Sequence, residues 1–392
     1  MWVYIVVVIL LLFLSFNYDI SGKRAGRDGW YNAVLVFLIL IAGLRWRVGT
    51  DTIAYLARFY HQYPTLDNFS ISNYGLGQDP FYALINVIVK TLGGRFYMVQ
   101  IIQATIVNVL VFKYIKRHSK YIFTCVLFYF FINYLNYNME TMRGSISIAI
   151  CLFGYDYIME KKWLKGYLLY IIACLFHYQT LVILLLPSLF WIRFNKYGIM
   201  LFVVAFVTGF FLKSIIEDYM FLLGGNEILE EKVEDKIYSD RWGEQQGNLN
   251  YFIGVILIKI VYPITAFLII RKYSNNQNVK RLEPFVILCI MFVFIQLNIN
   301  IAFRYVYYFE VYFAIIYSEV FANFFPWVLH KKKHFAFSLL IFFPILFYHG
   351  YTKLRTHKYH PYTSVIEMSV DREKENAFQY RFNYTPPNRN EY

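Results

Sequence analysis

Charged residues are scarce in this chain, at 16% of 392 residues, whereas soluble domains carry about 25%. That scarcity excludes an ordinary soluble globular protein and indicates a bilayer as the solvent. Hydrophobic residues make up 58% of the chain and form continuous runs between short polar breaks. Because the runs do not alternate as the strands of a barrel would, we expect an all-α polytopic integral membrane protein.

Cysteine is rare as well, and several sequence motifs are missing. The 4 cysteines lie inside apolar runs and form no metal-ligand or disulfide pattern. The sequence also lacks a glycine-rich phosphate loop, a zinc pattern and a nucleophile elbow. These absences argue against an ATP or nucleotide-sugar site of the soluble type, and we predict no metal and no cofactor.

Acidic residues are outnumbered, with 25 Asp and Glu against 38 Lys and Arg, which gives a net charge of +13. A basic chain can bind nucleic acid, but these basic residues lie in the short breaks between apolar runs. Membrane topology alone requires such a distribution. We therefore predict no nucleic-acid partner.

The apolar runs predict about twelve transmembrane helices in one domain over residues 1–350. Residues 351–392 form a polar C-terminal tail on the outer face, which we expect to be partly disordered. The predicted spans are 2–16, 31–44, 97–115, 121–137, 145–159, 164–176, 178–192, 198–215, 249–270, 283–300, 305–325 and 335–350.

The distribution of lysine and arginine between the breaks predicts an orientation. The opposite short breaks at 138–144, 177 and 301–304 hold at most one basic residue each. Short basic loops stay in the cytoplasm, so both termini are predicted outside, together with the longer segments 45–96 and 217–248. The breaks that hold two to four basic residues are 21–30, 116–120, 160–165, 193–196, 271–281 and 331–333.

The outer segment 45–96 predicts two helices near the membrane interface. In the first, Asp51, Tyr55, Arg58 and Phe59 recur at helical spacing and would share one face. A helix of this kind would cover the membrane-embedded bundle from outside.

The second outer helix is predicted to follow Asp79-Pro80, with the aspartate as N-cap and the proline at the first helical position. It would end at Gly93-Gly94. The other long outer segment, 217–248, is rich in acidic residues and predicts an amphipathic cap.

Several charged side chains and one histidine fall on the predicted outer side. A charge at a membrane is costly and usually has a partner or a task. Arginine forks bind phosphate oxygens in pairs and stay charged when partly desolvated, so this set suits an anionic ligand such as a diphosphate. The residues are Arg45, Arg47, Asp51, Arg143, His177 and Arg304.

Each of these residues also has a purely structural interpretation. The arginines can extend to lipid headgroups or anchor spans at the interface. Asp51 can cap a helix or pair with Arg47, and His177 can be a hydrogen-bonded packing residue. For charged residues inside the spans, ion pairing within the bundle is the favoured interpretation; these are Lys259, Glu310 and Glu319.

Three stretches carry a family resemblance. They are RWRVGTDTIAY at 45–55, DPFYALINVIVKTLGGRF at 79–96, and the stretch 142–187, in which Arg143 opens a small-residue helix and His177 follows a basic turn. These stretches resemble the EpsG/Wzy-like family of bacterial exopolysaccharide and O-antigen polymerases.

The second half of the chain resembles that family mainly through Arg304 and HPYTSV at 360–365. Two positions depart from the family pattern. Gly144 stands where a glutamine is common, and Phe81 stands where a glycine is often found.

The resemblance implies a multi-span, GT-C-like fold in the bacterial inner (cytoplasmic) membrane. It implies a glycosyltransferase that joins polyprenyl-diphosphate-linked oligosaccharide units on the outer face, for capsule, exopolysaccharide or O-antigen synthesis. The reaction would need no nucleotide and no essential metal. The expected partners are the polyprenyl-diphosphate-linked glycans, the lipid bilayer and a chain-length regulator.

On this interpretation, Arg143 and Arg304 bind the donor diphosphate, and Arg47 assists them or holds Asp51. Asp51 or His177 would take the proton from the acceptor hydroxyl. We favour His177, because a neighbouring arginine keeps the aspartate a weak base. The residues expected to contact the glycan are Arg45, Tyr55 and Arg58.

Other functions fit the same sequence features. A flippase or transporter of lipid-linked oligosaccharides would also be polytopic, basic on the inside and free of nucleotide motifs. A different outer-face glycosyltransferase, an O-acyltransferase or a non-enzymatic subunit would share much of the pattern. A transporter should place its charges near mid-membrane, whereas here they are predicted on one face.

Overall fold

The computed structural model describes residues 2–70, 79–222, 249–273, 276–299, 302–330, 359 and 362–368. These residues are helical or irregular and contain no strand; an isolated β-bridge joins Arg45 and Ser364. The chain divides into two compact units, which are described separately below. The first is Met1–Arg117, Ile122–Pro187 and Leu346–Tyr392, and the second is His118–Tyr121 and Ser188–Ile345.

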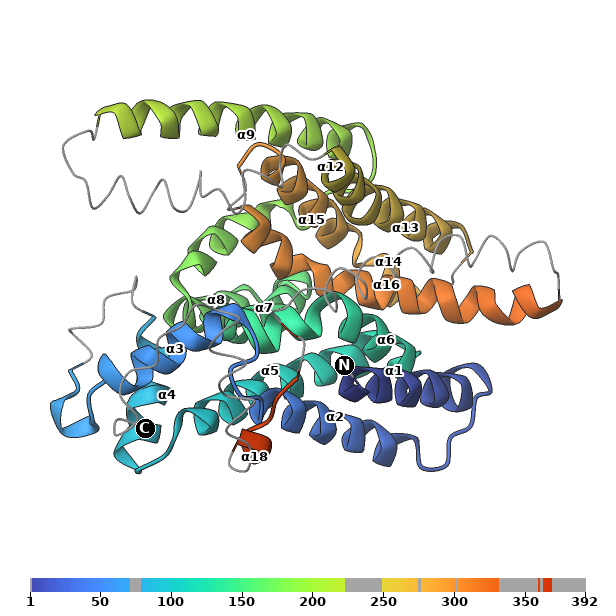
Figure 1. Ribbon diagram of the computed structural model, residues 1–392. Coiled ribbons are helices and arrows are strands. Elements are labelled where there is room, and N and C mark those ends of the chain that lie inside the picture. The colour runs from blue at the N-terminus through green and yellow to red at the C-terminus, as the bar shows by residue number, and fades with distance from the viewer. Residues whose placement is uncertain are drawn as a thin grey trace. The chain divides into compact units, whose positions relative to one another are not determined.

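The first unit contains most of the described helices (Figure 1). Between them lie short π and 3-10 turns, labelled η. The elements are α1 (Trp2–Leu14), η1 (Ser15–Ile20), α2 (Arg27–Gly43), α3 (Thr50–His61), η2 (Leu66–Asn68), α4 (Pro80–Thr91), α5 (Phe96–His118), α6 (Ile122–Tyr129), η5 (Phe130–Tyr134), η6 (Asn136–Glu140), α7 (Met142–Met159), α8 (Trp163–Phe176), the start of η7 (Tyr178–Leu189), and α18 (Val365–Met368).

The second unit is built around two helices with stacked aromatic rings, Phe285 and Tyr312, whose centroids are 4.5 Å apart. A predicted ion pair inside the spans is confirmed here, since Lys259 Nζ lies 3.2 Å from Glu310 Oε1. The elements are α9 (Lys196–Leu222), α12 (Leu249–Ile256), η8 (Leu257–Val261), α13 (Tyr262–Tyr273), α14 (Gln277–Lys280), α15 (Glu283–Gln296) and α16 (Phe303–His330).

Each predicted span except 335–350, which lies outside the described residues, overlaps a helix. Three of the described helices are long and apolar enough to cross a membrane: Trp2–Ile20, Phe96–His118 and Phe252–Lys272. The all-helical, membrane-type fold class is therefore confirmed. The count of twelve spans, the GT-C-like architecture and the single domain over 1–350 stay predictions.

The pair of short helices around His177 differs most from ordinary spans. α8 has 14 residues and η7 has 12 residues, and η7 is a 3-10 helix. At their respective rises they extend about 21 Å and about 24 Å, less than the ~30 Å of a hydrocarbon core. His177 thus lies between two segments that each end short of a full crossing.

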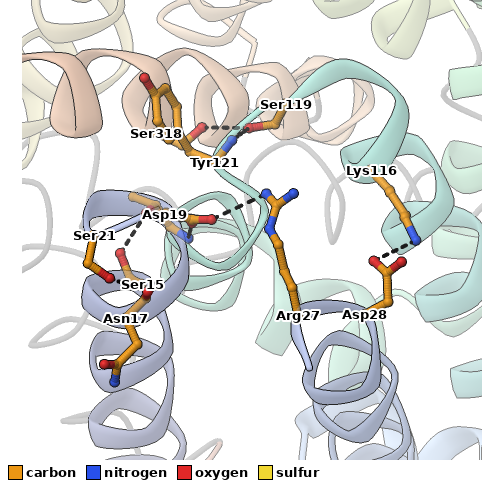
Figure 2. Close-up of polar contacts among 11 residues, drawn as sticks. Ser15, Asn17, Asp19, Ser21, Arg27, Asp28, Lys116, Ser119, Tyr121 and Ser318 are labelled. Carbon is orange, nitrogen blue, oxygen red and sulfur yellow. Dashed lines mark hydrogen bonds and ion pairs between the residues drawn. The ribbon is translucent and has the colours of Figure 1, made fainter. Parts of the chain in front are cut away.

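Polar contacts hold together one end of the first unit, the end whose loops are predicted to lie in the cytoplasm. Asp19 is buried in η1, accepts a 2.7 Å hydrogen bond from the Thr124 amide and lies 3.5 Å from Arg27 Nη2. Lys116 of α5 pairs with Asp28 of α2 at 2.9 Å. Figure 2 shows the two pairs side by side at the start of α2.

Helices α7 and α8 pack closely because glycines line their contact. A Cβ atom at Gly154 would lie 2.3 Å from Tyr170 Cε1, and one at Gly166 would lie 2.6 Å from Ile158 Cδ1. The backbones can therefore approach at distances that larger residues would prevent. A short turn joins the two helices, so the start of α7 lies next to the end of α8 (Figure 1).

Candidate active site

The chain turns sharply between α2 and α3 at Gly49, whose φ of +96° favours glycine. A Cβ atom there would lie 2.1 Å from the Met139 carbonyl oxygen, so no side chain fits. Thr52 reinforces the contact with a 3.2 Å hydrogen bond to the same oxygen. The turn fixes the start of α3 against the residues that lead into α7.

Asp79 is the centre of a polar cluster in the first unit. Its side chain is 0% exposed, and its carboxylate oxygen Oδ2 forms an ion pair with Arg143 Nη1. The same oxygen lies 3.4 Å from His177 Nδ1. The other oxygen, Oδ1, accepts a 2.9 Å hydrogen bond from the Tyr178 amide. One carboxylate therefore holds a cation and an imidazole together.

Three separate elements bring this cluster together. Asp79 precedes α4, Arg143 lies in the first turn of α7, and His177 ends α8. The packing of α7 on α8 places the arginine near the histidine. A 5.4 Å contact between the rings of Phe81 and Phe176 joins the start of α4 to the end of α8.

His177 is held at both ring nitrogens. Nδ1 faces Asp79, and Nε2 lies 3.1 Å from Gln179 Oε1. With the proton on Nδ1 donated to Asp79, Nε2 would have a lone pair and could act as a base. Gly144 lies beside the ring, and a Cβ atom there would make a van der Waals contact of 3.4 Å with His177 Cδ2. Of the His177 side chain, 13% is exposed.

Arg143 is anchored on the other side by Tyr55 of α3. Its Nε donates a 3.1 Å hydrogen bond to the Tyr55 hydroxyl, and its guanidinium lies 5.4 Å from the centre of the ring. Burial raises the pKa of Tyr55, so the phenol stays protonated. Burial also lowers the pKa of Arg143, but Tyr55 and Asp79 raise it by more, and the guanidinium stays charged.

The Arg143 guanidinium retains donors for a ligand. Its hydrogen bonds to described residues involve Nε and Nη1, and 23% of the side chain is exposed. The two N–H groups of Nη2 make no hydrogen bond to any described residue. An arginine fixed in this way can offer a preorganised charge to an oxyanion.

The other sequence-predicted residues near α3 lie in different environments. Asp51 is exposed in the first turn of α3, and its charge raises the pKa of Tyr55 as a smaller effect than burial. Arg58 is half-buried on the same helix. Arg47 is 3% exposed, and its guanidinium lies 5.2 Å from the centre of the Trp46 indole ring.

Among the described residues, Arg45 makes no hydrogen bond to Asp79, Arg143 or His177. Arg45 is 0% exposed, with Nη1 donating to the Ala42 carbonyl. Arg304 belongs to the second unit, in the first turn of α16, with its guanidinium 5.9 Å from the Phe303 ring. A site shared by Arg304 and Arg143, and the glycan contacts of Arg45, Tyr55 and Arg58, stay predictions.

Asp79 is the residue that the sequence assigned to a different role. It occupies the predicted N-cap position before Pro80, but its side chain makes no capping hydrogen bond, because the carboxylate binds Arg143 and the Tyr178 amide instead. A backbone φ of +54° turns it away from the helix. In the described part of the chain, no group of three His, Cys, Asp or Glu side chains could hold a metal.

Comparisons with known proteins identify one family. The family model described as EpsG matches residues 29–364, which include all the candidate residues named above. No curated protein and no solved structure matches the chain. The EpsG family is membrane-associated, which agrees with the apolar helices.

Proposed function

The chain belongs to the EpsG family, and from this membership we propose that it is a polysaccharide polymerase acting on lipid-linked oligosaccharide units. Family membership itself suggests an exopolysaccharide-related polymerase with glycosyltransferase-like activity. The proposal adds the donor, a glycan on polyprenyl diphosphate, and the place, the outer face of the bacterial cytoplasmic membrane.

The observation that carries this proposal is the contact of one carboxylate with both Arg143 and His177. The reaction needs a cation for the leaving diphosphate and a base for the attacking hydroxyl. Asp79 Oδ2 pairs with Arg143 Nη1 and lies 3.4 Å from His177 Nδ1, so the two groups lie within one cluster. Such fixed geometry lowers the entropic cost of bringing two substrates together.

In the proposed reaction, Arg143 binds the donor diphosphate with the two N–H groups of Nη2. The acceptor hydroxyl oxygen forms a bond to the anomeric carbon of the donor sugar, and the bond between that carbon and the diphosphate oxygen breaks. The electron pair leaves with the diphosphate, whose charge Arg143 stabilises. The hydroxyl proton passes to His177 Nε2, while Asp79 holds Nδ1–H and keeps the imidazole in place.

Base function at Nε2 requires the lone pair to face the acceptor. Gln179 Oε1 lies 3.1 Å from this nitrogen and can only accept a hydrogen bond, so the Gln179 side chain has to turn its NH2 group toward Nε2 or move aside when substrate binds. Asp51 is the second candidate base, one helical turn before Tyr55 on α3. Its side chain is exposed, so solvent and an acceptor can reach it.

The remaining predicted roles complete the proposal. Arg304 and Arg47 would add charge to the diphosphate site, and Arg45, Tyr55 and Arg58 would contact the glycan. A chain-length regulator is a further partner, and the bilayer supplies both substrates. The substrate carries its own leaving group, so the proposal includes no nucleotide and no metal.

The test is the profile of lipid-linked saccharides in cells with and without the gene. A polymerase predicts that single lipid-linked units accumulate outside the membrane when the protein is absent. Accumulation inside would instead indicate a flippase, and full-length but unmodified polymer would indicate a modifying enzyme. Either of these results would contradict the proposal.

Two variants test the residue roles in the complemented strain. Arg143→Lys keeps the charge but loses the fork, and we expect polymer to be much shorter. His177→Ala should stop chain extension while leaving the amount of protein intact. Matched controls are Arg95→Lys and His61→Ala, because both residues are exposed and neither belongs to the cluster. Normal polymer length in His177→Ala would remove this residue from the chemistry.

A further inference from the structure

Arg45 presents a buried and unused pair of hydrogen-bond donors. Its Nε and Nη2 atoms are buried and form no hydrogen bond with any described residue, while Nη1 donates to the Ala42 carbonyl. The Nε–H and Nη2–H groups of an arginine lie side by side and point in one direction. This edge of the guanidinium matches two oxygens of a phosphate or carboxylate.

A segment from the far end of the chain pairs with the backbone on both sides of Arg45. This docked segment consists of Tyr359 and residues 362–365. The Trp46 amide donates to the Thr363 carbonyl at 2.8 Å, and the Val365 amide donates to the Leu44 carbonyl at 2.8 Å. These bonds flank the bridge between Arg45 and residue 364. The docked segment thus lies directly on the backbone of Arg45.

Tyrosine hydroxyls secure the docked segment to the helices around it. Tyr362 donates a 2.9 Å hydrogen bond to the Ile41 carbonyl at the end of α2. Tyr4 of α1 donates to the Tyr359 carbonyl at 3.0 Å, and the rings of Tyr4 and Tyr362 meet edge to face at 5.9 Å. The docked segment therefore makes specific hydrogen bonds with two helices.

The closed arrangement leaves a cation in an unfavourable environment. Burial lowers the pKa of Arg45 to about 10, and the tyrosines around it, including Tyr134 and Tyr362, together with the Glu140 carboxylate, compensate only in part. Buried donors without acceptors are expensive, more so when the group is charged. An oxyanion that reached the free edge of Arg45 would remove this cost, provided that the docked segment moved aside.

Arg45 also lies close to the cluster around Asp79 through Tyr82. The Tyr82 phenol acts electrostatically on Arg45, and Arg143 acts on Tyr82. The Tyr82 ring meets the Tyr55 ring at 5.6 Å, and the Tyr55 hydroxyl binds Arg143. An anion at Arg45 would therefore be within electrostatic reach of the candidate active site.

We propose that Arg45 is a second anion site, which takes a phosphate group and is opened and closed by the docked segment. The inference rests on the proposed function only in assigning this phosphate to a second lipid-linked substrate. A free phosphate has the same chemistry, and the experiment separates the two sources. Arg45 would contact this phosphate in addition to the glycan contact expected from the sequence.

The experiment measures how fast a cysteine in the docked segment reacts with maleimide. Full-length protein carrying Ser364→Cys is labelled in detergent with no ligand, with farnesyl diphosphate, with inorganic pyrophosphate or with farnesol. We expect either diphosphate to raise the rate about tenfold, which corresponds to about 1.4 kcal/mol, close to the lower end of the range for one hydrogen bond to a charged group. A response to inorganic pyrophosphate shows that the anion suffices, and a response to farnesyl diphosphate alone shows that the lipid is needed.

Matched variants assign the response to Arg45. It should disappear in Arg45→Gln, remain in Arg143→Gln, and remain in Arg95→Gln, a control at an exposed arginine. Ser21→Cys, an exposed cysteine outside the docked segment, should label at one rate throughout. A response that survives Arg45→Gln but is lost in Arg143→Gln would overturn the inference, as would an equal response to farnesol.

A disulfide supplies a second measurement if Arg45→Gln does not fold. Leu44 and Val365 flank the antiparallel bridge and share the 2.8 Å hydrogen bond from the Val365 amide, and Cα atoms of such neighbours lie about 5.5 Å apart, within disulfide range. With both residues changed to cysteine, oxidation should reduce farnesyl diphosphate binding from two molecules per chain to one. Reduction should restore the second. Unchanged binding in the oxidised protein would overturn the inference. The one molecule that still binds after oxidation would occupy the candidate active site, so its binding tests the proposed function independently.

Discussion

Replacing Asp79 with asparagine should disable the cluster while keeping its shape. The Asp79 side chain is 0% exposed and has contacts with Arg143, His177 and the Tyr178 amide. Asparagine retains one carbonyl oxygen for the amide but loses the charge that pairs with Arg143 and aligns the imidazole. Asp79 acts through these two residues and is therefore a positioning residue.

The magnitude follows from the burial of the pair. Breaking a buried ion pair costs about 3–5 kcal/mol, and solvent reduces that value where one partner is exposed. Arg143 keeps 23% of its side chain exposed, so we expect about 2–3 kcal/mol for Asp79→Asn. If the activation free energy rises by that amount, the rate of chain extension falls roughly 30- to 200-fold, because about 1.36 kcal/mol corresponds to a factor of ten.

The assay is chain extension in membrane vesicles supplied with lipid-linked units, normalised to the amount of the protein. The control is Asp67→Asn, which removes an exposed carboxylate in η2. Asp79→Asn should also change how the rate of chain extension depends on pH. Asp79→Glu should restore part of the rate and return its pH dependence toward that of the unchanged protein. A merely structural role would lower the yield of folded protein without altering the pH profile. Extension at the normal rate in Asp79→Asn would refute the reasoning.

Two further predictions concern α3 and α4. Lys90 of α4 donates hydrogen bonds of 2.6 to 3.2 Å to three carbonyls at the C-terminal end of α3. Lys90→Met should therefore lower the free energy of unfolding by about 1–2 kcal/mol. The measurement is thermal unfolding in detergent, with Lys165→Met, at an exposed lysine, as the control. An unchanged midpoint would mean that water replaces these bonds at no cost. Gly49→Ala forces a Cβ atom to within 2.1 Å of the Met139 carbonyl oxygen, so it should lower the free energy of unfolding by more than about 2 kcal/mol and abolish chain extension. A Cβ atom at Gly29 has nothing within 4 Å, so Gly29→Ala should be neutral. Equal behaviour of the two variants would contradict the packing described for the turn.

Hydrophobic runs located the helices well, because continuous apolar sequence in lipid leaves the backbone little choice. They could not distinguish an α-helix from the 3-10 helix of η7, which contains Pro187. Nor could they show that His177 ends α8 with an extended backbone. Those details depend on packing between helices rather than on the hydropathy of one segment.

The candidate site was predictable in part, for a similar reason. Arg143, His177 and Tyr55 were identified from charge, position and spacing, and the structure brings these three together around Asp79. Asp79 was assigned to a helix N-cap because its neighbour is proline, and nothing local indicates that its carboxylate binds elsewhere. Its true partners are 64 and 98 residues away in sequence.

The backbone pairing at Arg45 could not be predicted either, since residues 363–365 come from the opposite end of the chain. A polar tail with prolines and asparagines is typical of disorder. Only the pairing of backbone groups with residues 44–46 explains why part of it has a defined position. The sequence HPYTSV contributed to the resemblance without indicating this contact.

The docked segment sets an order on biosynthesis. Thr363 emerges from the ribosome 317 residues after Trp46, yet the two share a pair of hydrogen bonds. During translation the turn after α2 therefore stays without these hydrogen bonds until nearly every other helix has been synthesised. Truncation before residue 359 would leave that surface permanently open to chaperones and proteases, whereas a fusion placed well beyond residue 368 would leave the closing contact intact.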